Sequence, residues 1–268
     1  MTAPSTPATC TIAPRWVLIL GVSSGIGAAT ARRLAADGFD IAGVHLDRPS
    51  ALEAVAEVRA GIEQCGRRAV FFNQNACREE NRRQIVSSLK AQLGGRSIYL
   101  VLHSIAAGVL RSFLGEGAVK EEDVSRTMQC MGSDIVFWVQ ALHAEGLLQS
   151  PGRVLALTSE GHQRVWPGYG AISAAKAALQ ALVRQLAVEL APARITANCI
   201  LAGVTDTPAL RRIPGHTQML LGAQTRNPHA RLTRPEDVAA LVSLLCDERA
   251  AWVSGSVIHC DGAESIRA

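Results

Sequence analysis

Gly21-Val22-Ser23-Ser24-Gly25-Ile26-Gly27 forms a glycine-rich turn between a short apolar run at 16–20 and a helical pattern at 25–37. Glycines at these places allow a tight turn, close approach of the backbone to a ligand and close packing of helix on strand. The helix that begins here has free backbone N–H groups, which bind phosphate oxygens. A turn of this kind inside a β-α-β unit predicts the pyrophosphate cradle of a dinucleotide. We therefore expect the following residues to bind a cofactor: Gly21, Ser23, Ser24, Gly25, Ile26 and Gly27.

Short apolar runs alternate with helical patterns from this turn to the end of the chain. Strands are expected at 16–20, 39–46, 69–75, 99–103, 153–158, 195–200 and 257–260. Helices are expected at 25–37, 51–65, 121–148, 169–190 and 235–247, with a further polar helix that ends at 93. Such alternation predicts a parallel sheet covered by helices on both faces. We expect one α/β domain over 15–268, a Rossmann-type doubly wound sheet of about seven strands, after a flexible tail over 1–14.

Composition narrows the classes of protein that the chain can belong to. A formal net charge of +4 over 268 residues, with no basic block, argues against nucleic acid as a partner. The seven cysteines form no Cys-x-x-Cys pair and no Cys/His cluster, which is typical of reduced thiols and predicts no metal site. The apolar runs are only strand-sized, and the first fourteen residues lack the features of a signal peptide. We expect a cytoplasmic protein without a membrane span.

The end of the second expected strand bears on the form of the dinucleotide. An acidic residue about twenty positions beyond the glycine turn usually accepts the adenosine ribose hydroxyls and favours NADH, and Asp47 stands at that distance. Arg48 can instead bind a 2′-phosphate through two hydrogen bonds, which favours NADPH. His45 lies in the same stretch. The residues alone leave both cofactors open, and we expect His45, Asp47 and Arg48 to contact the cofactor.

One tyrosine and one lysine are the expected catalytic residues. The chain has only two tyrosines and three lysines, and Lys176 lies in the middle of an otherwise apolar helix. Its ammonium either reaches solvent along the helix surface, or binds the nicotinamide ribose and lowers the pKa of a nearby phenol. Tyr169 precedes Lys176 by seven residues, a rotation of about 700°, so both side chains lie on one helix face. A phenol with a lowered pKa can act as an acid near neutral pH.

The turn spacing G-x-x-x-G-x-G resembles the short-chain dehydrogenase/reductase superfamily, and the likeness extends from about residue 16 to 266. Most members carry Tyr-x3-Lys, but Ile172 takes that tyrosine's place here. The spacing Tyr169-x6-Lys176 is instead similar to the enoyl-acyl-carrier-protein reductases. The stretch 107–111 resembles their type III, whereas His103-Ser104-Ile105 resembles type I.

The resemblance implies further cofactor contacts and a third site residue. Asn75 and Ala76 stand where the superfamily contacts adenine. The nicotinamide pocket and the phosphates would be lined by residues after the fourth and sixth strands, namely His103, Ser104, Ile105, Gly203, Thr205 and Thr207. Ser159 takes the place of a second tyrosine of type I enzymes, where its hydroxyl can help to hold a thioester oxygen or can simply end a polar strand. The stretch 208–227 would be a substrate lid, with Arg211 and Arg212 as candidates for docking an acidic carrier.

By this resemblance we expect an NADPH-dependent homotetramer that reduces an enoyl thioester on acyl carrier protein, with NADH possible. The unusual spacing has a chemical reason: hydride is delivered to C3 while charge develops on the C1 oxygen, so the phenol must meet a displaced oxyanion. Leu20, Met131 and Glu160 depart from the family pattern. They leave open a reductase of ketones or alcohols in specialised metabolism, or a nucleotide-sensing protein without catalysis.

Overall fold

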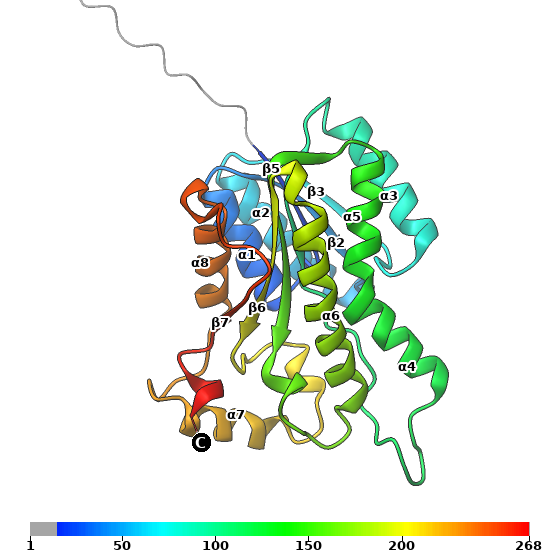
Figure 1. Cartoon of the computed structure of the whole chain (residues 1–268), viewed down its shortest axis with the longest axis vertical. Helices are drawn as coiled ribbons and strands as arrows, with labels where there is room; N and C mark the ends of the chain where they lie inside the picture. Colours follow the sequence, from blue (N-terminus) through cyan, green and yellow to red (C-terminus); the bar gives the residue numbers. More distant parts are fainter. Residues whose placement is uncertain (1–14, 268) are drawn as a thin grey trace, which may run out of the picture.

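A parallel sheet of seven strands, in the order β3-β2-β1-β4-β5-β6-β7, forms the centre of this computed structural model, which describes residues 15–267 (Figure 1). The chain starts in the middle of the sheet and builds outward in both directions, so β1 and β4 flank the point where the strand order reverses. Ligands of such sheets bind at this point, outside the carboxyl ends of the strands. The strands are β1 (Trp16–Leu20), β2 (Asp40–His45), β3 (Ala69–Asn73), β4 (Ile98–His103), β5 (Leu148–Ser159), β6 (Ile195–Ala202) and β7 (Val257–Cys260).

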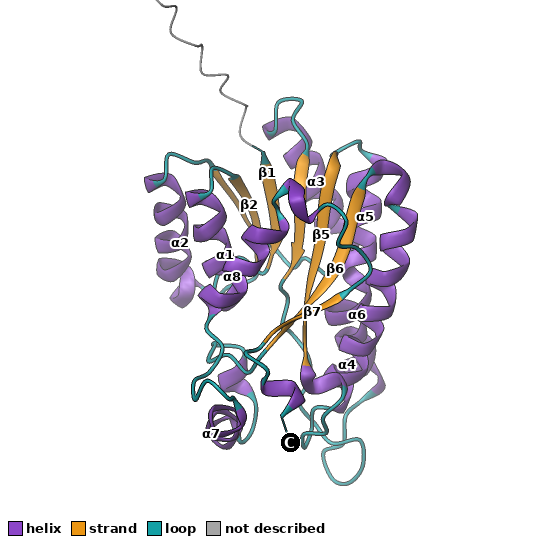
Figure 2. Cartoon of the chain, turned by 60° about the vertical axis from the view of Figure 1, so that its left-hand side comes forward, coloured by secondary structure: helices purple, strands orange, loops and turns teal. Residues whose placement is uncertain are grey.

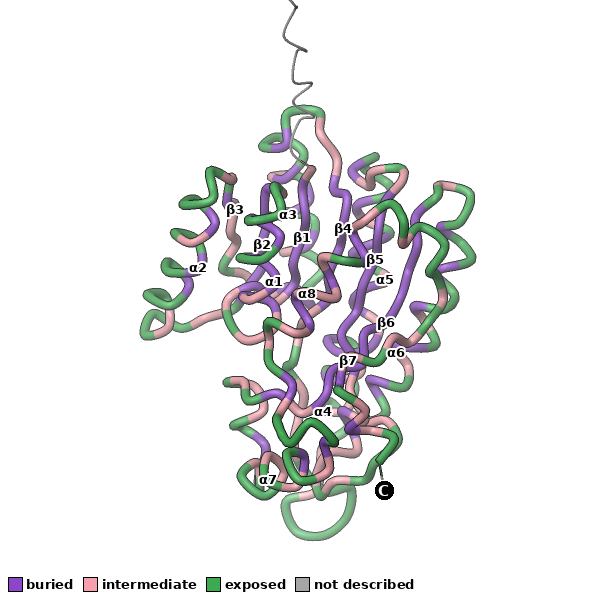
Figure 3. Tube along the Cα trace, turned by 90° about the vertical axis from the view of Figure 1, so that its left-hand side faces the viewer, coloured by how far each residue is buried: buried purple, intermediate pink, exposed green. Residues whose placement is uncertain are grey.

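Helices cover both faces of the sheet, as the alternating pattern predicts (Figure 2). One apolar core lies under α1 (Gly25–Ala36), α2 (Leu52–Gln64) and α8 (Pro235–Leu245). The other lies under α3 (Glu79–Gln92), α5 (Asp134–Ala144) and α6 (Gly170–Glu189). The central strands are buried along their length (Figure 3). The prediction of a doubly wound α/β fold is therefore confirmed.

Strand β1 shows why the apolar runs were readable as strands. All five of its residues are fully buried, because a central parallel strand contacts helices on both faces. Val17 and Ile19 enter the core under α1, whereas Leu18 and Leu20 enter the core under α6.

The prediction of one continuous helix over 121–148 is wrong. The structure divides it into α4 (Glu121–Met128), a π-helical segment (Gln129–Ser133) and α5, which ends at Ala144. Gly146, with a φ of 65°, turns the chain out of the helix, and β5 begins at Leu148 rather than at 153. Local apolar spacing does not reveal such a break, because the helical period continues across it.

The end of β3 and one additional helix also differ from the sequence prediction. β3 ends at Asn73, so Asn75 and Ala76 lie in the turn after the strand rather than at its end. An additional helix, α7 (His216–Arg226), forms within the stretch expected to be a lid, and it lies beyond the carboxyl edge of the sheet (Figure 1).

No helix within residues 15–267 is both long enough and apolar enough to span a bilayer. Over the same residues, no group of three or more His, Cys, Asp or Glu side chains is arranged to hold a metal ion. The tail predicted over 1–14 lies outside the described residues.

Candidate active site

The glycine turn joins β1 to α1 at the middle of the carboxyl edge. Gly21 and Gly25 have positive φ values of 94° and 53°, which glycine adopts without strain. Gly27 packs against the Gly21 carbonyl so tightly that a Cβ at position 27 would overlap the oxygen. The first hydrogen bond of α1 runs from Ala28 N–H to Ser24 O, at 3.2 Å. The N–H groups of residues 25–27 therefore point out of the helix end, as a phosphate requires.

Two other predicted segments lie against this turn. Ser104 N–H donates to Leu20 O at 2.8 Å, which places the residue directly after β4 beside the turn. Ser104 Oγ would lie 3.3 Å from a Cβ on Gly27. On the other side, Thr207 Cγ2 would lie 3.1 Å from a Cβ on Gly25. Ser104 and Thr207, which are 83 and 186 positions after Gly21 in the sequence, thus both lie against the glycine turn.

The residues after β6 form the rest of this wall. Thr205 is buried and its hydroxyl donates to Gly203 O at 2.9 Å, which fixes the turn. Gly203 packs so closely against Thr233 that no side chain fits there. The predicted residues Gly203, Thr205 and Thr207 are therefore part of one rigid turn that faces the glycine turn.

At the end of β2, the three residues predicted to select the cofactor have different surroundings. The Asp47 carboxylate lies 2.9 Å from His45 Nδ1, and Asp47 N–H donates to Asn73 Oδ1 at 3.0 Å. His45 is buried, whereas Arg48 is exposed. The structure thus holds the carboxylate in place and leaves the guanidinium open to solvent.

The predicted adenine contacts Asn75 and Ala76 are held by local bonds. Asn75 Oδ1 accepts from Cys77 N–H at 2.9 Å, which closes a turn. Ala76 O accepts from Trp138 Nε1 at 3.2 Å, and Ala76 is buried. Ile105, on the opposite side, is half-buried against the core under α6.

Tyr169 stands at the N-cap of α6, immediately before its first residue. The phenol is half-buried, and its ring packs on Gly161, where a Cβ would collide with the ring. Burial raises the pKa of Tyr169 above its usual value, while the neighbouring Ser159 hydroxyl lowers it. Ser159 Oγ is itself buried without a hydrogen-bond partner among the described residues. The two hydroxyls at the end of β5 are therefore available to a substrate oxygen.

The prediction that Lys176 lowers the pKa of Tyr169 is wrong. The pKa of the phenol is raised, and Lys176 is not among the groups that influence it. The Lys176 ammonium turns toward the sheet and donates to Leu157 O at 2.7 Å. The phenol is consequently a proton-bearing hydrogen-bond donor across the neutral range.

Lys176 occupies a buried slot across three strands. His103, Ala156 and Cys199 are register neighbours on β4, β5 and β6, and the small Ala156 side chain leaves room above the sheet. Burial lowers the pKa of Lys176 to about 8. Burial and the neighbouring ammonium lower the pKa of His103 to about 3, so the imidazole is neutral. Lys176 does not reach solvent, which excludes the surface alternative considered for it.

Ile172 fills the position where most of the superfamily carry the tyrosine. It is buried, and a Cβ on Gly108 would collide with its side chain and with the Met131 sulfur. Met131 belongs to the π-helical segment, and Ile172, Met131 and Ala175 form a small apolar cluster that Tyr169 also contacts. No phenol can enter at position 172 without moving this cluster.

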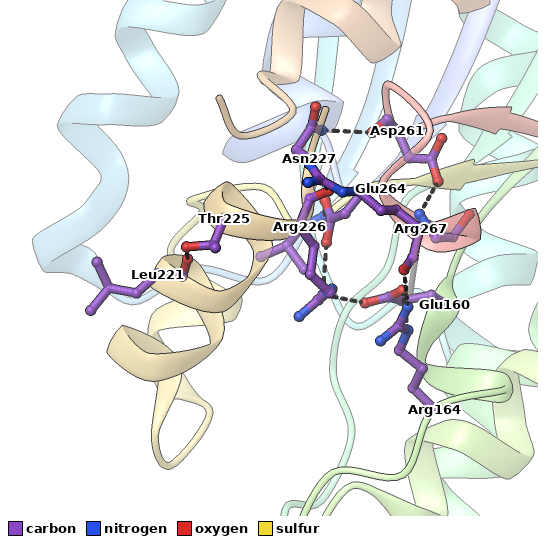
Figure 4. A network of polar contacts seen from close by, with 12 residues as sticks. Glu160, Arg164, Leu221, Thr225, Arg226, Asn227, Asp261, Glu264 and Arg267 are labelled. Atoms are coloured by element: carbon purple, nitrogen blue, oxygen red, sulfur yellow. Dashed lines mark hydrogen bonds and ion pairs between the residues drawn. The ribbon is translucent and has the colours of Figure 1, made fainter. Parts of the chain in front are cut away.

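The lid stretch 208–227 carries the candidates for carrier docking. Arg211 forms two hydrogen bonds with Asp206, at 2.7 and 2.8 Å, and Arg212 is exposed. At the far end of the lid, Arg226 lies between Glu160 and Glu264 (Figure 4). The sequence analysis missed Arg226 and Glu264, since residues 38 and 66 positions apart show no shared spacing. The only signal was the unusual Glu160 beside Ser159.

Replacing Gly27 with alanine is expected to abolish tight dinucleotide binding. The added Cβ overlaps Gly21 O, so the turn must open, and overpacking of this kind costs about 1–3 kcal/mol of stability. We expect the Kd for NADPH, measured by fluorescence titration, to rise about a hundredfold. Gly61→Ala, on α2, is the matched control, because a Cβ there would meet only the Arg32 side chain, at 3.6 Å. Wild-type affinity in Gly27→Ala would show that the cofactor does not use this turn.

Comparison with known proteins agrees with this geometry. The sequence model of the family described as enoyl-(acyl carrier protein) reductase matches residues 21–263. The short-chain dehydrogenase/reductase eriH of Hericium erinaceus is 32% identical over 91% of this chain and 95% of its own. The 3-oxoacyl-[acyl-carrier-protein] reductase FabG of Aggregatibacter actinomycetemcomitans is 32% identical over 92% of this chain and 97% of its own.

Among solved structures, the NADH-dependent enoyl-[acyl-carrier-protein] reductase of Aquifex aeolicus VF5 matches with a TM-score of 0.82 and 25% identity. The match covers 94% of this chain and 96% of that chain. The family match spans the glycine turn, Tyr169 and Lys176. The chain therefore belongs to the short-chain dehydrogenase/reductase family, whose members are NAD(P)H-binding oxidoreductases.

Proposed function

We propose that this chain reduces the C2–C3 double bond of an enoyl thioester with NADPH. The observation that carries the proposal is the single phenol at the carboxyl edge, Tyr169 beside Ser159, together with the aliphatic Ile172 in the other possible position. The second tyrosine, Tyr99, is the second residue of β4, at the opposite edge of the sheet, and donates to Cys246 O at 2.7 Å, so it takes no part.

NADPH, when bound, supplies the hydride that C3 receives. Negative charge then develops on the thioester oxygen at C1, two carbons away from the hydride acceptor, until a proton from water adds to C2 and the thioester carbonyl re-forms. Tyr169 O–H donates a hydrogen bond to this oxygen, and the raised pKa keeps the phenol protonated for that purpose. The buried Ser159 hydroxyl, which has no hydrogen-bond partner within residues 15–267, is a second donor to the same oxygen. Lys176 would hold the ribose of the nicotinamide.

The proposal of NADPH rests on the end of β2. His45 Nδ1 lies 2.9 Å from the Asp47 carboxylate, and a hydrogen bond from the imidazole weakens the repulsion that this carboxylate exerts on a 2′-phosphate. Arg48 is exposed next to it and can bind the phosphate. NADH remains the alternative if the carboxylate accepts the ribose hydroxyls instead.

The proposed partner is an acyl carrier protein in the cytoplasm, within fatty acid or lipid metabolism. Arg211 is neutralised by Asp206, so Arg212 is the basic residue of the lid that remains for an acidic surface. We also propose a homotetramer assembled on α4, α5 and α6. Phe137 on α5 is 40% exposed, and such a surface is stabilised by an apolar partner.

A direct comparison of substrates tests the reaction. We expect crotonyl-CoA to support NADPH oxidation about tenfold or more faster than acetoacetyl-CoA at equal concentration. The oxyanion of an enoyl thioester lies two carbons farther from the hydride than that of a ketone, and the proposal assigns Tyr169 to the former. Faster oxidation with acetoacetyl-CoA would overturn the proposal.

Carbonyl reduction is the second candidate, because FabG, a relative at 32% identity, is named as a 3-oxoacyl reductase. In that reaction Tyr169 would protonate the carbonyl oxygen directly.

Tight binding of NADPH without turnover of either thioester would favour the third possibility, a nucleotide-sensing protein.

A further inference from the structure

Arg226, the last residue of α7, joins two buried carboxylates that belong to different parts of the site (Figure 4). Its Nη2 lies 3.0 Å from Glu160 Oε1 and 3.1 Å from Glu264 Oε1. The Glu264 side chain is 1% exposed and that of Glu160 is 13% exposed. We call Glu160, Arg226 and Glu264 the lid latch.

Each carboxylate of the lid latch also has a second attachment. Glu160 directly follows Ser159 at the end of β5, and its Oε2 lies 2.8 Å from Arg164 Nε. Glu264 Oε2 accepts from Val204 N–H at 3.1 Å, in the turn after β6. A single guanidinium therefore connects the lid with the reacting hydroxyls and with the predicted nicotinamide turn.

A second contact ties the start of the lid to the same catalytic segment. Trp166 Nε1 donates to Pro214 O at 3.2 Å, and Trp166 is only three residues before Tyr169. The lid is thus fixed at 214 and at 226, both times to the stretch between Ser159 and Tyr169. Movement of α7 away from the sheet must break the bonds of Arg226.

The charges explain why an arginine is needed at this place. Two carboxylates close to one another repel, and burial together with Glu160 raises the pKa of Glu264. Arg226 Nη2 carries two N–H groups and lies within hydrogen-bond distance of both carboxylates, and Arg164 supplies a second positive charge to Glu160. A lysine side chain is one atom shorter, so its ammonium does not reach the place from which Nη2 contacts both carboxylates.

We propose that Arg226 is a positioning residue that holds the lid closed over Ser159 and Tyr169, and so sets the affinity for substrate rather than the rate of the chemical step. The proposal rests on the proposed function only in placing the substrate beneath α7.

The test compares Arg226→Gln and Arg226→Lys with wild type. We expect KM for the thioester that is turned over to rise about tenfold or more in Arg226→Gln, because charge-assisted hydrogen bonds are lost, with kcat changed less than about threefold. With NADPH present in both samples, the amide hydrogens of 216–226 should exchange about tenfold faster in Arg226→Gln than in wild type. This measurement needs no turnover. Arg226→Lys should recover little of the change.

Two further variants make the result decisive. Arg226→Gln leaves the Glu160 carboxylate without its Arg226 partner, and Glu160→Gln removes that charge. The double variant should therefore raise KM by less than the product of the two single effects. Arg249→Gln, which breaks the exposed pair with Asp247, is the matched control and should leave KM and exchange unchanged. Unchanged KM and exchange in Arg226→Gln, or a fall in kcat alone, would overturn the proposal. If neither thioester is turned over, the exchange of 216–226 still decides it.

Discussion

Tyr169→Phe is expected to lower kcat/KM for the thioester about a thousandfold, the loss typical of removing an oxyanion donor or a general acid. Phenylalanine keeps the ring that packs on Gly161 and the apolar cluster, so only the hydroxyl is lost. The remaining Ser159 hydroxyl preserves part of the stabilisation. Steady-state NADPH oxidation measures the loss, and an unchanged Kd for NADPH shows that the cofactor still binds.

Tyr99→Phe provides the matched control, since it removes the other phenol of the chain. It deletes the hydrogen bond to Cys246 O, at a cost of about 1 kcal/mol of stability, and should leave kcat/KM unchanged. Ile172→Tyr combined with Tyr169→Phe tests the spacing, because the cluster around Gly108 and Met131 leaves no space for a ring. Full enoyl reduction by that double variant would show that the phenol at 169 is dispensable.

Local sequence pattern was sufficient to predict the strand and helix order of the fold and the position of the glycine turn. The glycine turn and the helix after it are specified by neighbouring residues, so Gly21, Gly25 and Gly27 could be assigned to one turn from the sequence. The doubly wound sheet then follows from alternation, because parallel strands need helical crossovers. Lys176 stands out in the sequence by its apolar surroundings, and the structure shows that it is buried.

Properties that depend on burial or on distant contacts could not be predicted in this way. The pKa of Tyr169 was expected to be lowered by an ammonium, but burial raises it, and burial is set by Gly161 and the cluster around Ile172. The lid latch joins Glu160 with residues 66 and 104 positions later. α7 escaped notice because its sequence, HTQMLLGAQTR, buries only Ala223 and shows no broad apolar stripe.

Lys176→Met is expected to lower kcat/KM about a hundredfold while stability stays the same or rises. Methionine matches the length and apolar character of the lysine stem, so packing in the slot is preserved. Burial lowers the pKa of Lys176 from 10.5 to about 8, so keeping the ammonium charged at pH 7 costs about 3 kcal/mol in the folded state. Removal of the charge relieves this cost, which is partly offset by the lost bond to Leu157 O. Thermal unfolding and steady-state rates measure the two effects separately.

The pH dependence of the wild type gives an independent test of the same cation. The folded state holds the Lys176 proton less tightly than the unfolded chain, so the ammonium is present below pH 8 and is lost as the pH rises through about 8. The pKa of Tyr169 is above its usual range, so the phenol cannot cause an activity loss near pH 8. We expect kcat/KM of the wild type to fall above pH 8. The residual kcat/KM of Lys176→Met should not fall in this pH range. Lys90→Met, which removes a surface lysine paired with Glu145, should keep the wild-type kcat/KM and its fall above pH 8. A stable, active Lys176→Met with an unchanged profile would mean that the lysine merely fills the slot between His103 and Cys199.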